Sequence, residues 1–192
     1  MVKQLQLFED VPAPITGEAQ EEMPDLEMRM DALSMKLYEI AFKILVWGPS
    51  LRSQSAVARK RREIYQRLKQ EKHKVWFSEE FSRRRGITLY MQEKTQAEQS
   101  DLIILLVEEN SPGSIGEMHD FCRNAKLITK IYLLVPKSMQ QSYNADSVIW
   151  TIDKGYGGVY WYEHIDIAQC HVLTAVMERV EARRSLVLMN ML

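Results

Sequence analysis

The sequence predicts a doubly wound α/β domain with a five-stranded parallel sheet, of the flavodoxin-like or Rossmann-like kind. Three observations lead to this fold class. Short apolar runs alternate with longer segments of helical periodicity along most of the 192 residues, which is typical of parallel sheets covered by helices. The run 102–107 is apolar at every position, as expected for a strand buried on both faces. Gly, Pro and Ser follow several of these runs and indicate turns.

The N-terminal part of the chain has a different pattern from the rest. Residues 1–24 carry three of the six prolines and many acids, so we expect a flexible acidic arm. Residues 25–41 should form an amphipathic helix, because apolar residues recur there at helical spacing and need cover from the domain or from a second subunit. These residues are Leu26, Met30, Leu33, Leu37 and Ile40. The α/β domain itself is expected over 42–192.

Each element of this domain follows from the local pattern. Apolar or β-branched runs predict the strands, and a 3.6-residue apolar period predicts the helices. The strands are expected at 42–47, 74–78, 102–107, 130–135 and 159–162. The helices are expected at 53–70, 88–99, 116–126 and 166–184. Residues 79–87 are predicted to be a loop, and 137–156 to be irregular apart from short structure near 147–152.

Composition narrows the function classes. The net charge of −1 does not favour binding of polyanions by bulk charge, and the two cysteines lack metal-like spacing. The N-terminus has no secretory signal pattern, and the C-terminal apolar run is too short to cross a bilayer. We therefore expect a cytoplasmic protein with no metal, no cofactor and no membrane partner.

Charge is unevenly distributed along the chain. Residues 1–31 hold eight acids against two bases, whereas residues 59–85 hold eleven Lys or Arg against four Glu. These segments are either a solvated tail and a solvated helix face, or a positive field beside a phosphate-bearing ligand. Nucleic-acid binding by the basic run 59–62 is possible but less favoured, because no aromatic residues are interleaved with it.

Three segments should meet at one edge of the sheet, because ligands of such sheets bind beyond the carboxyl ends of the strands. They are 48–52, 79–93 and 111–117. The last contains two glycines and leads into a helix start, whose free backbone N–H groups can hold an anion. Glu117 stands at that start, so we interpret it as the chemical centre. The alternative is that Glu117 only complements the helix dipole.

Short motifs in these segments support a nucleotide-binding interpretation. Residues 47–52 read Trp-Gly-Pro-Ser-Leu-Arg, Glu93 lies upstream of Asp101, and Ser111-Pro112-Gly113 precedes Glu117. Together they resemble the nucleoside 2-deoxyribosyltransferase family, and most closely its branch of 2′-deoxynucleoside 5′-monophosphate N-glycosidases. The likeness spans about residues 42–135. Ser111 stands where the transferases place an Asp, which favours the phosphate-using branch.

The resemblance implies roles for individual residues. Glu117 would attack the anomeric carbon as nucleophile, and Glu93 would assist departure of the base. The implied substrate-binding residues are Gly48, Ser50, Arg52, Ser111, Gly113 and Ser114. Sites in this family are completed across subunits, so the resemblance also implies a homo-oligomer.

The predicted activity is cleavage of the N-glycosidic bond of a nucleotide, by hydrolysis or transfer. A nucleoside 5′-monophosphate is the preferred substrate and an NAD-type dinucleotide the next. The chemistry requires carboxylates, because the sugar acquires oxocarbenium-like charge that one carboxylate can stabilise or attack while another group protonates the base. The alternative is a non-catalytic nucleotide-binding sensor that acts through a protein partner.

Overall fold

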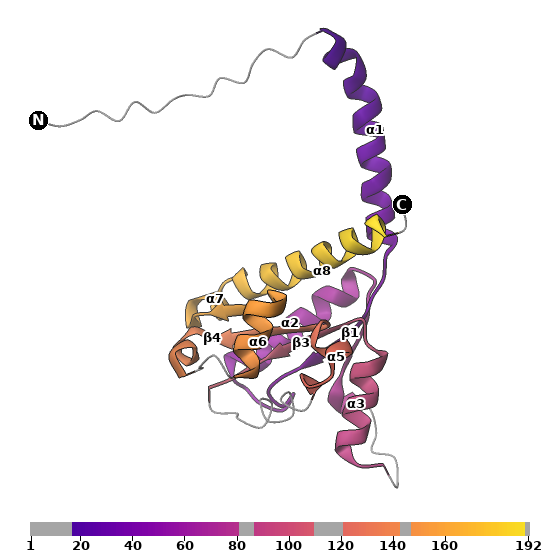
Figure 1. Ribbon diagram of the computed structural model, residues 1–192. Helices are drawn as coiled ribbons and strands as arrows, with labels where there is room; N and C mark the ends of the chain where they lie inside the picture. Colours follow the sequence, from indigo (N-terminus) through magenta and orange to yellow (C-terminus); the bar gives the residue numbers. More distant parts are fainter. Residues whose placement is uncertain (1–16, 81–86, 110–120, 143–146, 191–192) are drawn as a thin grey trace, which may run out of the picture.

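The computed structural model describes residues 17–80, 87–109, 121–142 and 147–190, and its five parallel strands form one sheet (Figure 1). The strand order is β2-β1-β3-β4-β5, which is the flavodoxin-like order. The predicted fold class is therefore confirmed. The strands are β1 Lys43–Trp47, β2 Lys74–Phe77, β3 Leu102–Leu106, β4 Ile131–Pro136 and β5 Val159–Tyr162.

Helices cover both faces of this sheet, and the strands bury alternate residues toward each. One face packs against α2, α7 and α8, and the other against α3, α5 and α6. β3 is buried at all five positions, as its sequence predicts. The described helices are α1 Gly17–Glu39, α2 Ala56–Gln70, η1 Ser78–Glu80, α3 Leu89–Gln99, α5 Ala125–Ile128, η2 Lys137–Ser142, α6 Val148–Tyr156, α7 His164–Ala168 and α8 His171–Met189.

The N-terminal helix α1 is longer than predicted. It begins at Gly17 rather than near residue 25, so part of the predicted acidic arm is helical. Most of α1 extends away from the domain, beyond the C-terminal end of α8 (Figure 1). Within the described residues, no helix combines the length and the apolar character needed to cross a bilayer.

Three helix predictions differ from the structure, and local capping explains two of them. The helix predicted to continue to residue 126 has ended by 122, and α5 begins separately because the Asn124 side chain accepts a hydrogen bond from the Lys126 N–H. α6 was predicted only in part. Its ends are capped by the Ser147 hydroxyl and by Gly157, whose φ of 56° is left-handed. The predicted helix 166–184 is divided into α7 and α8 by residues 169–170.

Candidate functional site

The loop after β1, residues 48–55, leaves the sheet where the strand order reverses. β1 and β3 are neighbours, but the chain continues from β1 to β2 on one side and from β3 to β4 on the other. Ligands of doubly wound sheets bind at this point. Within the loop, the Ser50 hydroxyl oxygen accepts a hydrogen bond from the Arg52 backbone N–H at 3.3 Å. Both side chains are exposed, so a solute can reach them.

Gly48 has a structural reason to be glycine. Its φ is +149°, and a Cβ at this position would lie 3.0 Å from the Leu106 carbonyl oxygen and 3.3 Å from Cδ of Arg61. A side chain would therefore separate β1 from β3 or displace the arginine. The loop consequently begins pressed against the end of the central strand.

The basic run 59–62 at the start of α2 anchors this loop through side-chain hydrogen bonds. Arg62 donates to the carbonyl oxygens of Leu51 and Ser53, and Arg59 donates to that of Gln54. Lys60 is 5% exposed and donates to the Gln169 carbonyl oxygen. The run is therefore not a solvated helix face, because most of its charge is directed at backbone carbonyl groups.

Arg61 is the most engaged of these cations. Its side chain is fully buried and donates to the carbonyl oxygens of Val46 and Pro49, each at 2.7 Å. The same guanidinium forms a two-pronged pair with Glu79 in η1, with both N···O distances 2.7 Å, and lies over the Phe77 ring. Bidentate pairs of this kind fix orientation as well as charge. Arg61 therefore ties the β1 exit to the β2 exit.

The Glu79 carboxylate is ionised under ordinary conditions. Partial burial raises its pKa, but the hydrogen bonds and charge of Arg61 outweigh that effect and hold the pKa below its usual value. Ser78 adds a hydrogen bond from its hydroxyl at 3.0 Å. About 41% of the Glu79 side chain is exposed, so this carboxylate, paired with Arg61, lies at the rim of the candidate site.

A row of aromatic side chains borders the same edge. The Trp47 ring packs on Phe121, with centroids 5.2 Å apart, and Phe121 stacks on Tyr90 at 5.8 Å. Tyr90 is 45% exposed and ends the row at the surface. The buried Trp47 indole N–H has no hydrogen-bond acceptor in the described part of the chain. Exposed aromatic rings of this kind can stack on a nucleobase.

Glu93 lies one helical turn after Tyr90 and is half-buried. Residues three apart share a helix face, and α3 packs against β1. The predicted acid therefore lies beside the aromatic row, near the start of α3. Since α3 returns antiparallel to the strands, its start is at the carboxyl edge of the sheet.

A second feature of this edge is an open depression of about 540 Å³ beyond the ends of β4 and β5. Several polar side chains that line it are already paired with one another. Lys137 pairs with Glu163 at 2.7 Å, and the Ser138 hydroxyl donates to Glu109. Its lining residues are Glu109, Pro136, Lys137, Ser138, Tyr162, Glu163, His164 and Ile165. Among the described residues, no group of three or more His, Cys, Asp or Glu is arranged to hold a metal ion.

The predicted site residues fall into two groups. Gly48, Ser50, Arg52 and Glu93 are all described, and the first three share the loop at the β1 exit, at the same sheet edge as the start of α3. The others lie outside the described residues, so the structure places none of their side chains. They are Ser111, Gly113, Ser114 and Glu117.

Sequence reasoning missed Arg61, Glu79 and Tyr90. A signal for Arg61 was present, because it shares the 4-3-4 spacing of Val57, Ile64 and Leu68 on the buried face of α2. The i,i+3 relation between Tyr90 and Glu93 was also readable. Nothing in the sequence identified Glu79 as the partner of Arg61, because that pairing depends on how α2 crosses the sheet.

Residues 56–189, from α2 to the end of α8, match the family model described as STM3845 retron effector protein. The matched span includes Arg61, Glu79 and Glu93, whereas α1, β1 and the whole loop after β1 lie outside it. No curated protein matches the chain.

Proposed function

The chain belongs to the STM3845 retron effector family, and we propose that it acts as an enzyme that cleaves the N-glycosidic bond of a nucleotide. The observation that carries this proposal is the grouping at one sheet edge of an exposed Ser50–Arg52 turn, an aromatic row and the half-buried Glu93. These are groups suited to a phosphate, a base and a proton transfer, respectively.

The proposed reaction uses two carboxyl groups. Glu117 attacks or stabilises the anomeric carbon as the bond to the base breaks, and Glu93 supplies the proton that the departing base needs. Water, or an acceptor base in a transfer, then takes the sugar from Glu117. In this proposal Ser50, Arg52, Ser111 and Gly113 hold the 5′-phosphate.

The preferred substrate is a nucleoside 5′-monophosphate, with an NAD-type dinucleotide next. An exposed arginine in a tight turn suits a terminal phosphate, because its guanidinium can make paired hydrogen bonds. A cytoplasmic retron effector that removes bases from nucleotides would act on a pool of small metabolites rather than on nucleic acid. The inward-facing basic run agrees with this, because most of its cations already bind backbone carbonyl groups.

The alternative is a nucleotide sensor without turnover that acts through a partner. The exposed apolar residues of α1 favour some partner contact under either function. The two functions differ in whether free base is released.

The decisive experiment incubates the protein with nucleoside 5′-monophosphates, deoxynucleotides and NAD, and measures free base by chromatography. We expect release from at least one substrate, and a fall of at least about a thousandfold in Glu117→Gln with nucleotide affinity retained. Glu98→Gln, an exposed glutamate at the far end of α3, is the matched control and should behave as wild type. Binding of nucleotide with no base release from any substrate would establish the sensor instead.

A further inference from the structure

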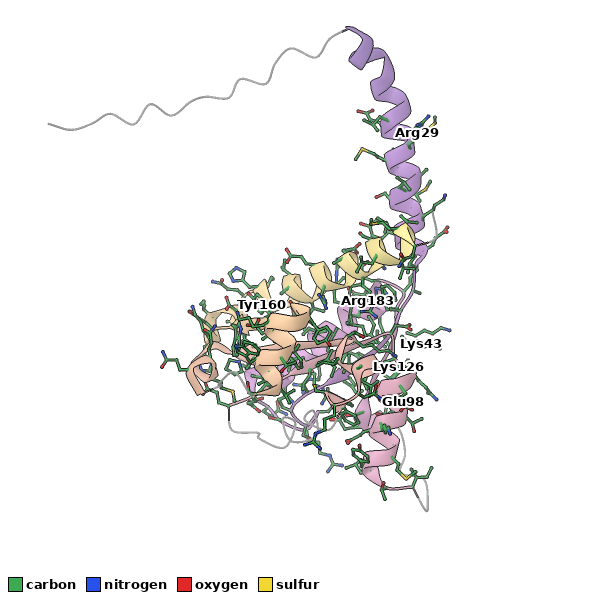
Figure 2. All side chains as sticks on the ribbon, in the orientation of Figure 1. Arg29, Lys43, Glu98, Lys126, Tyr160 and Arg183 are labelled. Atoms are coloured by element: carbon green, nitrogen blue, oxygen red, sulfur yellow. The ribbon has the colours of Figure 1, made fainter. Side chains whose placement is uncertain are left out.

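The face of α1 that bears Leu26, Met30, Leu33 and Leu37 is largely uncovered by the described part of the domain, and only Leu37, near the base of the helix, is partly buried. These residues follow a 4-3-4 spacing, the heptad spacing of helices that pack against another helix. Figure 2 shows α1, with Arg29 labelled, standing clear of the domain over most of its length. The exposed apolar side chains of α1 are Leu26 55%, Met28 65%, Met30 61%, Leu33 38%, Met35 66% and Tyr38 60%. A single helix exposed in this way needs packing to be stable in water.

The domain offers a groove that fits such a helix. It lies between α2 and α8, has a volume of about 510 Å³, and has Leu173 and Met177 as its apolar floor. Arg67 of α2 forms one rim, and Glu178 and Glu181 of α8 form the other. At 1.5 Å per residue, the groove along α8 is about 12 Å long and the α1 stripe from Leu26 to Leu37 about 17 Å, so the two lengths are compatible.

Charge favours this groove over pairing of α1 with another α1. Residues 17–39 hold seven acids and two bases, so two copies of α1 would repel each other. The flanks of the apolar stripe also match the rims of the groove. Glu27 lies on one flank and can face Arg67, while Lys36 lies on the opposite flank and can face Glu178.

We propose that α1 of one molecule occupies the α2–α8 groove of a second copy, and that the second copy returns the same contact. Reciprocal exchange closes a two-fold dimer and buries both stripes, whereas a one-way contact would leave one stripe and one groove open. The base of α1 joins the domain at Arg184 of α8, which donates to the Ile40 carbonyl oxygen at 3.2 Å and lies over the Tyr38 ring. The rest of α1 projects outward, where a second copy can reach it (Figure 2). This proposal does not depend on the proposed enzymatic activity.

The first test compares two methionines of nearly equal exposure on the same helix. The mass of the full chain is measured by light scattering during gel filtration, from low micromolar to about 100 μM. Met30→Glu puts a charge into the stripe and should weaken the dimer at least about tenfold in Kd. Met28→Glu lies about 200° around the helix from Met30 and should leave Kd within about twofold. Circular dichroism checks that both variants remain folded.

The second test identifies the groove. Glu178→Lys should weaken the dimer several-fold, and Lys36→Glu combined with Glu178→Lys should restore it, because the proposed ion pair is then reversed. A wild-type chain that is monomeric at about 100 μM would overturn the proposal. So would equal effects of the two methionine variants. A dimer that Met30→Glu disrupts but that the charge reversal does not restore would show that α1 packs elsewhere.

Discussion

Arg61 and Arg184 are both fully buried arginines, one at each end of the sheet, but their hydrogen bonds differ in number and length. Arg61 makes four hydrogen bonds of 2.7 Å, two to carbonyl oxygens and two to Glu79. Arg184 makes one short bond, to Glu181 at 2.6 Å, and its donor contacts to Ile40 and Glu71 carbonyl oxygens are 3.2 and 3.5 Å. The carboxyl end of the sheet is thus tightly clamped, and the amino end is more loosely joined.

The looser end also contains a titratable group. His73 accepts a hydrogen bond at Nδ1 from the Phe42 N–H at 3.0 Å, and its Nε2 lies 3.2 Å from Arg184. A neutral imidazole has only one acceptor nitrogen, and the Phe42 N–H occupies it. Nε2 of His73 therefore carries a hydrogen, so this N–H and the Arg184 N–H are two donors that face each other. Burial, and then the charge of Arg184, lower the pKa of His73 to about 4. Equal burial of two arginines therefore does not mean equal rigidity around them.

The largest expected effect comes from breaking the tight clamp. Arg61→Met should lower the free energy of unfolding by about 3 kcal/mol, because the backbone carbonyl groups and Glu79 lose their donors. It should also reduce base release per folded molecule more than tenfold, since the loop bearing Ser50 and Arg52 loses its anchor. Urea denaturation and the base-release assay measure the two effects.

Arg61→Lys is the control for this variant, because it keeps the positive charge but loses the paired N–H donors of the guanidinium group. It should recover only part of the stability. Wild-type stability in Arg61→Met would mean that the carbonyl contacts contribute little and that the clamp is not rigid.

A smaller effect is expected at the other end. Arg184→Met should cost about 2 kcal/mol of unfolding free energy, because fewer and longer contacts are lost and Glu181 can be hydrated. Base release per folded molecule should be unchanged, since the amino end of the sheet is opposite the candidate site. An activity loss equal to that of Arg61→Met would contradict the division of roles between the two ends.

The smallest effect is a pH dependence at His73. Its folded pKa of about 4 lies below the ordinary value of about 6.5, so the folded state favours the neutral ring. The contribution of the neutral His73 ring to the free energy of unfolding is fully present above pH 6.5 and is lost as pH falls toward 4. Unfolding free energy should drop by about 1 kcal/mol between pH 7.5 and 5.5 from this group.

His73→Gln is the comparison for the pH experiment, because the amide oxygen can still accept from Phe42 and does not titrate. Urea midpoints of both proteins at the two pH values give the difference. Parallel curves for the two proteins would show that His73 is protonated as easily in the folded state as in the unfolded one.

The sequence was sufficient for the sheet and for the position of one loop of the candidate site. The five strands were predicted to within about one residue at most ends, since continuous apolar runs of this length suit strands buried on both faces. The turn containing Gly48, Ser50 and Arg52 was also located, because ligand sites of such sheets follow strand ends. The proposed nucleophile Glu117 remains a prediction.

Helix boundaries were less predictable, because single side chains decide them. Asn124 starts α5 by accepting from a backbone N–H, and Gly157 ends α6 in a left-handed conformation. Neither residue stands out among the polar and glycine residues of the loops until the neighbouring backbone is known.

The sequence by itself determined the helical spacing that sets Arg61 and Arg184 in line with buried apolar residues of α2 and α8, a signal for burial that sequence reasoning missed. Only the tertiary structure decided what each arginine would bind. Glu79 meets Arg61, and His73 meets Arg184, because α2 and α8 pack across the ends of the strands. A periodic pattern reports burial because burial follows from local geometry. Partners come from segments far apart in the chain, so their identity depends on the packing of the whole domain.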